Sequence, residues 1–128
     1  MAAIQPYNAT VRECFENPDH AGDPQGDYDR VLKSTVMESE QGARIELWAC
    51  VADGIIAKMR YRTWGCPHLI AAAEVLCRRL ENGPVSGLSA LDVSALIEQL
   101  SVPVEKTGKL LLLEDALKAI WAQHGYAA

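Results

Sequence analysis

The residues best suited to metal or thiol chemistry are four cysteines, at positions 14, 50, 66 and 77. No two of them have the C-x-x-C spacing of zinc fingers or thioredoxin-like proteins, so neither kind of site is predicted. Cys66 lies between a glycine and Pro67, where a strand-like run gives way to a helix. The amide groups at a helix start favour a thiolate, and His68 could add an imidazole. We therefore select Cys66 as the candidate functional cysteine.

The other cysteines are interpreted as packing residues, because a free cysteine usually behaves as a small hydrophobic side chain. Cys77 lies on the same helical stripe as Cys66, but eleven residues at about 1.5 Å each put it about 16 Å away. It is too distant to share a metal with Cys66. His20 and His124 fall in loop-like and tail-like sequence, and we expect both to be solvent-exposed.

The composition excludes several classes of protein. The 128 residues are 49% hydrophobic and 23% charged, which favours one globular domain over residues 1–128 rather than a disordered chain. A net charge of −5 argues against nucleic-acid binding, since phosphate contacts need clustered Lys and Arg. Apolar runs are too short to cross a bilayer, and no secretion signal is recognisable. We expect a cytoplasmic protein with reduced thiols.

Hydropathy patterns predict an α+β domain. A short amphipathic helix over Tyr7–Glu16 ends before Asn17-Pro18, because the residue preceding a proline disfavours helix. Alternating apolar residues then predict strands over 29–37, 43–51 and 55–63. A small antiparallel sheet, followed by three helices, should carry those helices on one face.

The turn between the second and third strands sets their register. A two-residue turn at Asp53-Gly54 would place Leu47 opposite Arg60 and so mix apolar with charged side chains. A three-residue loop over 52–54 keeps the two kinds of side chain on separate faces, and it places Glu46 opposite Arg60. We therefore predict the three-residue loop.

Three helices are predicted in the second half of the chain. The apolar period becomes helical at Cys66 and continues until Gly83-Pro84. Ser89 is the predicted cap of a helix over Ala90–Leu100. After a loop, "SVPVEKTG", the last helix is expected from about Lys109 to Gln123.

Three stretches resemble the iron–sulfur cluster assembly scaffold family, IscU and the N-terminal domain of NifU. They are "YNATVRECFENPDHAG", "GIIAKMRYRTWGCPHLIAAAEVL" and "LEDALKAI". The resemblance covers nearly the whole chain. It implies a small non-enzymatic α+β domain in which three cysteines and an aspartate hold a nascent cluster, or zinc, before transfer to an acceptor protein.

The same resemblance implies that most of these ligands are replaced. Gln41 stands at the first family cysteine, and Ala43 stands at the aspartate. The second cysteine is Cys66. A histidine and the third cysteine, which precede the last helix in the family, correspond to Gly108 and Lys109. Of five expected donors, one is kept.

Partners also follow from the resemblance. Family members work with a cysteine desulfurase and offer a proline-rich loop to a dedicated Hsp70-type chaperone. Here that loop reads "VPVEK", in which Val102, Pro103 and Lys106 fit the pattern and residues 104 and 105 do not. An ordinary connection between helices explains the loop about as well.

These observations lead to one interpretation and two alternatives. The chain is interpreted as a cluster assembly protein whose degenerate site keeps only Cys66, with His68 as the best local helper. An iron–sulfur cluster or zinc would bind weakly or not at all, unless donors come from a second copy in a homodimer, a small thiol or a partner. The first alternative is a cluster-free adaptor or regulator that binds the desulfurase and the chaperone. The second uses the Cys66 thiol as a sulfur acceptor, although no nearby His–carboxylate pair is identifiable.

Overall fold

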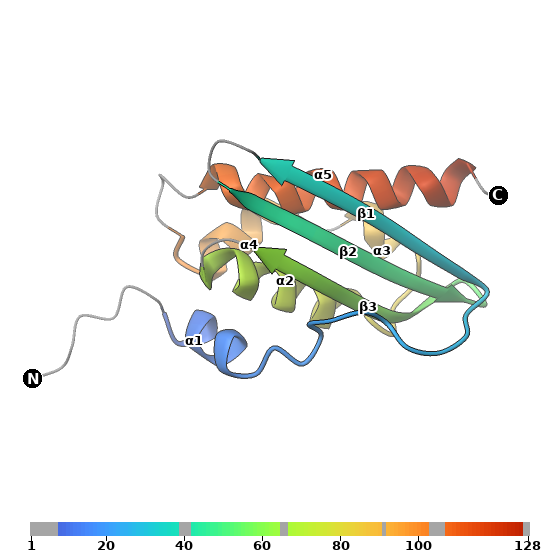
Figure 1. The fold of residues 1–128 in the computed structure, drawn as a ribbon, viewed down its shortest axis with the longest axis horizontal. Coiled ribbons are helices and arrows are strands. Elements are labelled where there is room, and N and C mark those ends of the chain that lie inside the picture. The colour runs from blue at the N-terminus through green and yellow to red at the C-terminus, as the bar shows by residue number, and fades with distance from the viewer. Residues whose placement is uncertain (1–7, 39–41, 65–66, 91, 103–106, 127–128) are drawn as a thin grey trace, which may run out of the picture.

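A computed structural model describes residues 8–38, 42–64, 67–90, 92–102 and 107–126 (Figure 1). Three antiparallel strands form a sheet in the order β1-β2-β3. Their bounds are β1 Arg30–Glu38, β2 Ala43–Ala52 and β3 Ile55–Trp64. The helices are α1 Ala9–Glu16, α2 Pro67–Leu80, α3 Gly87–Ala90, α4 Val93–Gln99 and α5 Thr107–Tyr126.

In the view of Figure 1, the helices from α2 to α5 lie behind the sheet and α1 lies below it, so the α+β prediction is confirmed. Alternation along β2 turns four apolar side chains toward them, Ile45, Leu47, Ala49 and Val51, all buried. From α2 and α5, buried leucines, alanines and Ile120 belong to the same core. This inner face of the sheet is the centre of the domain.

The opposite, outer face of the sheet is also partly shielded. Trp48 on β2 is only 8% exposed, and the Lys33 ammonium lies 5.1 Å from the centre of its ring. Cys50 is completely buried on the same face. Long cationic side chains therefore cover this face in place of a second layer of helices.

The predicted three-residue loop between β2 and β3 is wrong. Asp53 and Gly54 form a two-residue turn with φ angles of 55° and 73°, flanked by the pair Ala52↔Ile55. Positive φ at both central residues is typical of the turn that suits the right-handed twist of a hairpin.

A bulge resolves the conflict of faces that led to the wrong prediction. Cys50 pairs with Lys58 but Val51 pairs with Ile56, so Ala57 is an additional residue on β3. Beyond this bulge the register is displaced by one residue, and apolar side chains again meet apolar ones.

Two details of the predicted pairing change as a result of the bulge. Glu46 stands opposite Arg62, and Arg60 stands opposite Trp48. At the turn end, Ile56 is buried whereas Ile55 is 42% exposed.

The helix predicted over Ala90–Leu100 is shorter in the structure, because α3 ends at Ala90 and α4 spans Val93–Gln99. Ser89 does not cap it, because its hydroxyl donates to the carbonyl of Ser86 at 2.9 Å. Asp92 is the cap of α4, with a side-chain oxygen that accepts from the Ser94 amide at 2.9 Å. Among the described residues, no helix has both the length and the apolar character needed to span a membrane.

Candidate functional site

Four element ends meet at one end of the domain, which we call the donor end. Figure 1 shows the start of β2, the end of β3 and the starts of α2 and α5 together there, on the left of the view. The pair Arg44↔Trp64 joins the two strands at this point. Ala43 is the first residue of β2 and Gly108 is the second residue of α5, so two positions to which the resemblance assigns donors lie at these ends.

His68 lies in the first turn of α2 and is 1% exposed. Cys66 and Gln41 lie outside the described residues, as do Pro103 and Lys106. Val102 is described and packs, partly buried, against the core. Within the described ranges, no group of three or more His, Cys, Asp and Glu side chains could hold a metal ion.

The other three cysteines are buried free thiols, as the sequence predicts. Burial raises the pKa of Cys14, Cys50 and Cys77 above the usual range for a thiol. Because the thiolate is the reactive form, these side chains are suited to packing and not to chemistry.

A buried polar cluster around Glu74 was not expected from the sequence. Glu74 lies on α2 with 0% exposure. Its carboxylate accepts from the His20 amide at 2.9 Å, from Tyr61 Oη at 3.1 Å and from Arg78 Nε at 2.8 Å, and it lies 2.6 Å from His20 Nδ1. Burial and the adjacent Glu74 raise the pKa of the Tyr61 hydroxyl well above its ordinary value. The expectation that His20 is solvent-exposed is therefore wrong.

The second ring nitrogen of His20 lies 3.1 Å from a carboxylate oxygen of Glu81. Glu81 also accepts from the Met59 amide at 2.9 Å and from Arg60 at 2.8 Å. Burial opposes ionisation of Glu81, but the Met59 amide, His20 and Arg60 together lower its pKa. His20 thus ties the loop before β1 to the carboxylates of Glu74 on α2 and of Glu81 directly after α2.

Backbone pairing fixes the same loop to the edge of β3. The Tyr61 amide donates to the His20 carbonyl at 3.1 Å, and the Gly22 amide donates to the Tyr61 carbonyl at 2.8 Å. The sequence did contain one signal of this cluster, the charged Glu74 within the apolar run "AAAEVL" of a helix. A charge at such a position is rarely tolerated without partners.

Comparison with known proteins decides the family. The model of the NifU-like N terminal domain family matches residues 6–126. The chain belongs to the NifU-like N-terminal domain family.

Its relatives in this family cover nearly the whole chain. It is 28% identical over 119 residues to the iron–sulfur cluster assembly scaffold protein IscU of Escherichia coli, spanning 92% of this chain and 93% of that one. It is also 28% identical to iron sulfur cluster assembly protein 1 of Trachipleistophora hominis, over 90% of this chain and 83% of that one. The N-terminal NifU-like protein of Brucella abortus superposes with a TM-score of 0.70 at 17% identity, over 94% of this chain and 95% of that one, and so shares the fold.

Ala43 and Gly108, to which the sequence resemblance assigns two of the donor positions, have no side-chain atom that could bind a metal. Ala43, at the position that corresponds to the family aspartate, is 1% exposed and has only a methyl group. Gly108, at the position of the histidine, is exposed in α5 and has no side chain. The fold of the family is therefore present, and these two residues contribute no metal-binding group to the donor end.

Proposed function

We propose that this chain is a non-enzymatic iron–sulfur cluster assembly protein of the scaffold family, acting in the cytoplasm as a single domain. The observation that carries the proposal is the family match over residues 6–126. Relatives named as iron–sulfur cluster assembly scaffold proteins support it, because they align with this chain over nearly its full length.

The cluster site of this protein is incomplete. Iron–sulfur clusters normally take four donors, of which thiolates are the most suitable. Cys66 supplies one thiolate, and His68 is the nearest imidazole in the sequence. Ala43 and Gly108 supply nothing, and the amine of Lys109 is a poor ligand in its protonated form. The isolated chain therefore binds a cluster or zinc weakly, and a partner or a second copy strengthens binding by adding donors.

The partners in this proposal are a cysteine desulfurase and an Hsp70-type chaperone, with the loop around Val102, Pro103 and Lys106 as the chaperone contact. A second candidate function is an adaptor that binds these partners without a cluster. The buried methyl group of Ala43 favours the adaptor. A domain that binds no metal has no need of the carboxylate that the resemblance assigns to this position.

Metal analysis of protein purified without oxygen distinguishes the two functions. Iron, zinc and acid-labile sulfide are measured per chain, alone and with a desulfurase added. The proposal predicts substoichiometric metal that rises with the partner and is lost in Cys66→Ser. Cys77→Ser is the matched control, because it removes a buried thiol outside the donor end and should leave the metal content unchanged.

Two results would decide against the cluster-binding proposal. A colourless protein that stays free of metal with the partner present would favour the adaptor. Metal that is unaffected by Cys66→Ser would contradict the ligand role of Cys66.

A further inference from the structure

The outer face of the sheet carries an excess of positive charge. Strand alternation and pairing place on it one carboxylate, Glu46, and five cations: Lys33, Arg44, Lys58, Arg60 and Arg62. Flanking Asp23 and Glu81 pair with two of them, and still the cations outnumber the carboxylates by five to three. This excess stands out on a chain whose net charge is −5.

Three of these cations are held in place and still accessible. Arg44 stacks over Trp64 at 4.8 Å and pairs with Glu46 at 2.9 Å, while Lys33 lies 4.0 Å from the same carboxylate. Arg62 pairs with Asp23 at 3.0 Å. Their side chains keep exposures of 49% for Lys33, 42% for Arg44 and 50% for Arg62. Ordered side chains lose less conformational entropy when a partner binds.

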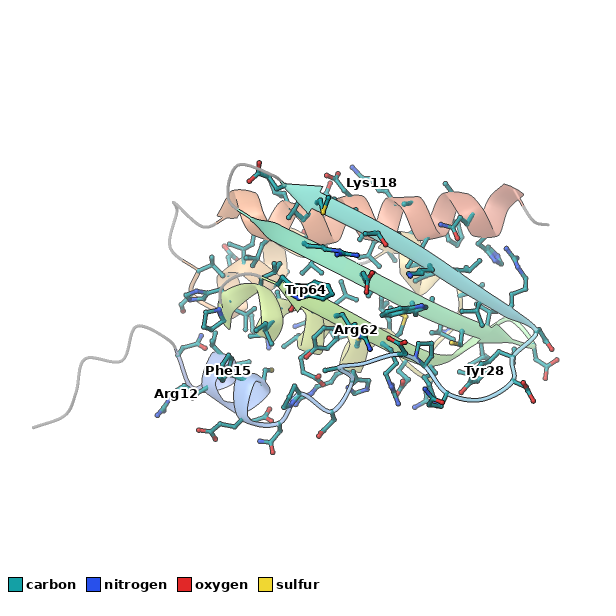
Figure 2. The ribbon with its side chains drawn as sticks, viewed as in Figure 1. Arg12, Phe15, Tyr28, Arg62, Trp64 and Lys118 are labelled. Atoms are coloured by element: carbon teal, nitrogen blue, oxygen red, sulfur yellow. The ribbon has the colours of Figure 1, made fainter. Side chains whose placement is uncertain are left out.

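An apolar anchor point adjoins these cations. Trp64 is 44% exposed and separates two hollows in the surface. The larger hollow, of about 560 Å³, also contacts Phe15 and Ile70, and the smaller, of about 310 Å³, contacts Met37 and Arg44. Figure 2 shows Arg62 and Trp64 on the side of β3 that faces the viewer, with Phe15 on α1 nearby. Trp and Arg are the residues most often responsible for affinity in protein interfaces.

We propose that this outer face docks an acidic partner protein, whose carboxylates contact Lys33, Arg44 and Arg62 while an apolar side chain enters a hollow beside Trp64. The surface uses neither Cys66 nor His68, so it goes beyond the proposed cluster function and does not depend on it. A face of three strands is small for a protein interface, so the complex is weak and is weakened further by salt.

A nucleic acid fits this face less well than an acidic protein. Proteins that bind single-stranded nucleic acid stack the bases on exposed aromatic rings. Here the Trp48 ring is only 8% exposed and lies beside the Lys33 ammonium. The chain as a whole would also repel a phosphate backbone. An apolar hollow at the end of a cationic face suits carboxylates interspersed with apolar side chains.

The three tryptophans allow a direct test, because Trp48 and Trp64 lie on this face and Trp121 lies on α5. The full chain is labelled with ¹⁵N at the indole nitrogens. It is titrated with a synthetic amphipathic peptide of glutamate and leucine, with a lysine–leucine peptide of equal length and with a thymidine oligonucleotide. We expect the glutamate peptide alone to shift the Trp64 and Trp48 signals, and we expect added salt to reverse the shift.

Variants separate this face from general electrostatics. Lys33→Glu with Arg62→Glu should weaken glutamate-peptide binding about tenfold or more, and Trp64→Ala should weaken it with the salt dependence retained. Lys118→Glu is the control, because that side chain is 71% exposed on α5 and lies outside the proposed surface. Circular dichroism checks that each variant is folded.

Several results would overturn the proposal. These are no shift with the glutamate peptide, an equal shift of Trp121, or an equal loss of affinity in Lys118→Glu. Tighter binding of the oligonucleotide at the same signals would assign the face to nucleic acid instead.

Discussion

The Glu74 cluster and the donor end share the elements β3 and α2, and the side chains gathered in the two regions differ in kind. Around Glu74, a fully buried carboxylate is met by His20, Tyr61 and Arg78. At the donor end, the resemblance assigns two donor positions to Ala43 and Gly108, which have no polar side-chain atom. The comparison teaches that the contacts of Glu74, which join α2 to β3 and to the loop before β1, use none of the positions assigned to donors.

The largest expected effect comes from removing the centre of the buried cluster. Glu74→Ala removes the acceptor of the Tyr61 hydroxyl and one acceptor each of His20 and Arg78, and we expect a loss of about 4 kcal/mol in the free energy of unfolding. Urea denaturation measures this loss. Glu114→Ala is the control, since its carboxylate is 41% exposed and pairs with Lys118 along its own helix, and it should cost a small fraction as much. Equal losses in the two variants would show that the cluster does not stabilise the fold.

The rate of thiol alkylation should differ greatly between Cys66 and the three buried cysteines. The buried thiols at positions 14, 50 and 77 have raised pKa values and little thiolate at neutral pH, so they should be alkylated at least about a hundredfold more slowly than Cys66. Mass spectrometry of the folded protein should then find one modified cysteine, and of the protein in urea, four. Modification of Cys77 before Cys66 would contradict this account of the donor end.

His20 tests whether the loop before β1 depends on the cluster. We expect His20→Ala to cost about 2 kcal/mol in the free energy of unfolding, because it removes contacts with the carboxylates of Glu74 and Glu81. Hydrogen exchange at the Gly22 and Tyr61 amides should become faster, since these amides pair the loop with β3. His124→Ala should leave both amides unchanged, and an equal acceleration there would refute a local role for His20.

The smallest expected effect lies at the hairpin turn, at the opposite end of β3 from the donors. Gly54 has a φ of 73°, and a side chain there would meet nothing within 4 Å, so the cost of Gly54→Ala is conformational strain alone. We expect about 1 kcal/mol from thermal or urea denaturation. Gly108→Ala also has open space, but its φ lies outside the left-handed region, and it should cost nothing. A cost-free Gly54→Ala would argue against the two-residue turn.

Local pattern was enough to predict the strands and the core face of the sheet, because apolar alternation is a property of neighbouring residues. The register was not predictable in this way. The register depends on Ala57, an additional residue in β3 that no hydropathy pattern indicates. The bulge at this residue allows a two-residue turn while apolar side chains still pair with apolar ones. The start of the helix predicted over 90–100 was misplaced for a similar reason, because Ser89 and Asp92 are both residue types that cap helices well.

Contacts between distant parts of the chain explain what the sequence missed near the site. His20 and Glu74 are 54 residues apart, and only the folded chain brings them together. The composition of a turn-rich loop indicated solvent, whereas pairing with the edge of β3 placed the histidine against α2. By contrast, the interpretation of positions 43 and 108 as replaced donors comes from the resemblance alone, because it depends on residue identity and not on geometry.

Restoring donors tests the central claim most directly. The claim is that this chain keeps the family fold and Cys66 but lacks the remaining ligands. We would compare wild type with Gln41→Cys/Lys109→Cys after anaerobic reconstitution with iron and sulfide, using Gln41→Ser/Lys109→Ser as the matched control, and measure cluster absorbance and sulfide per chain. The account predicts a stable cluster only in the double cysteine variant, and its loss when Cys66→Ser is added. A cluster of equal yield and stability in wild type, or in the double cysteine variant without Cys66, would contradict it.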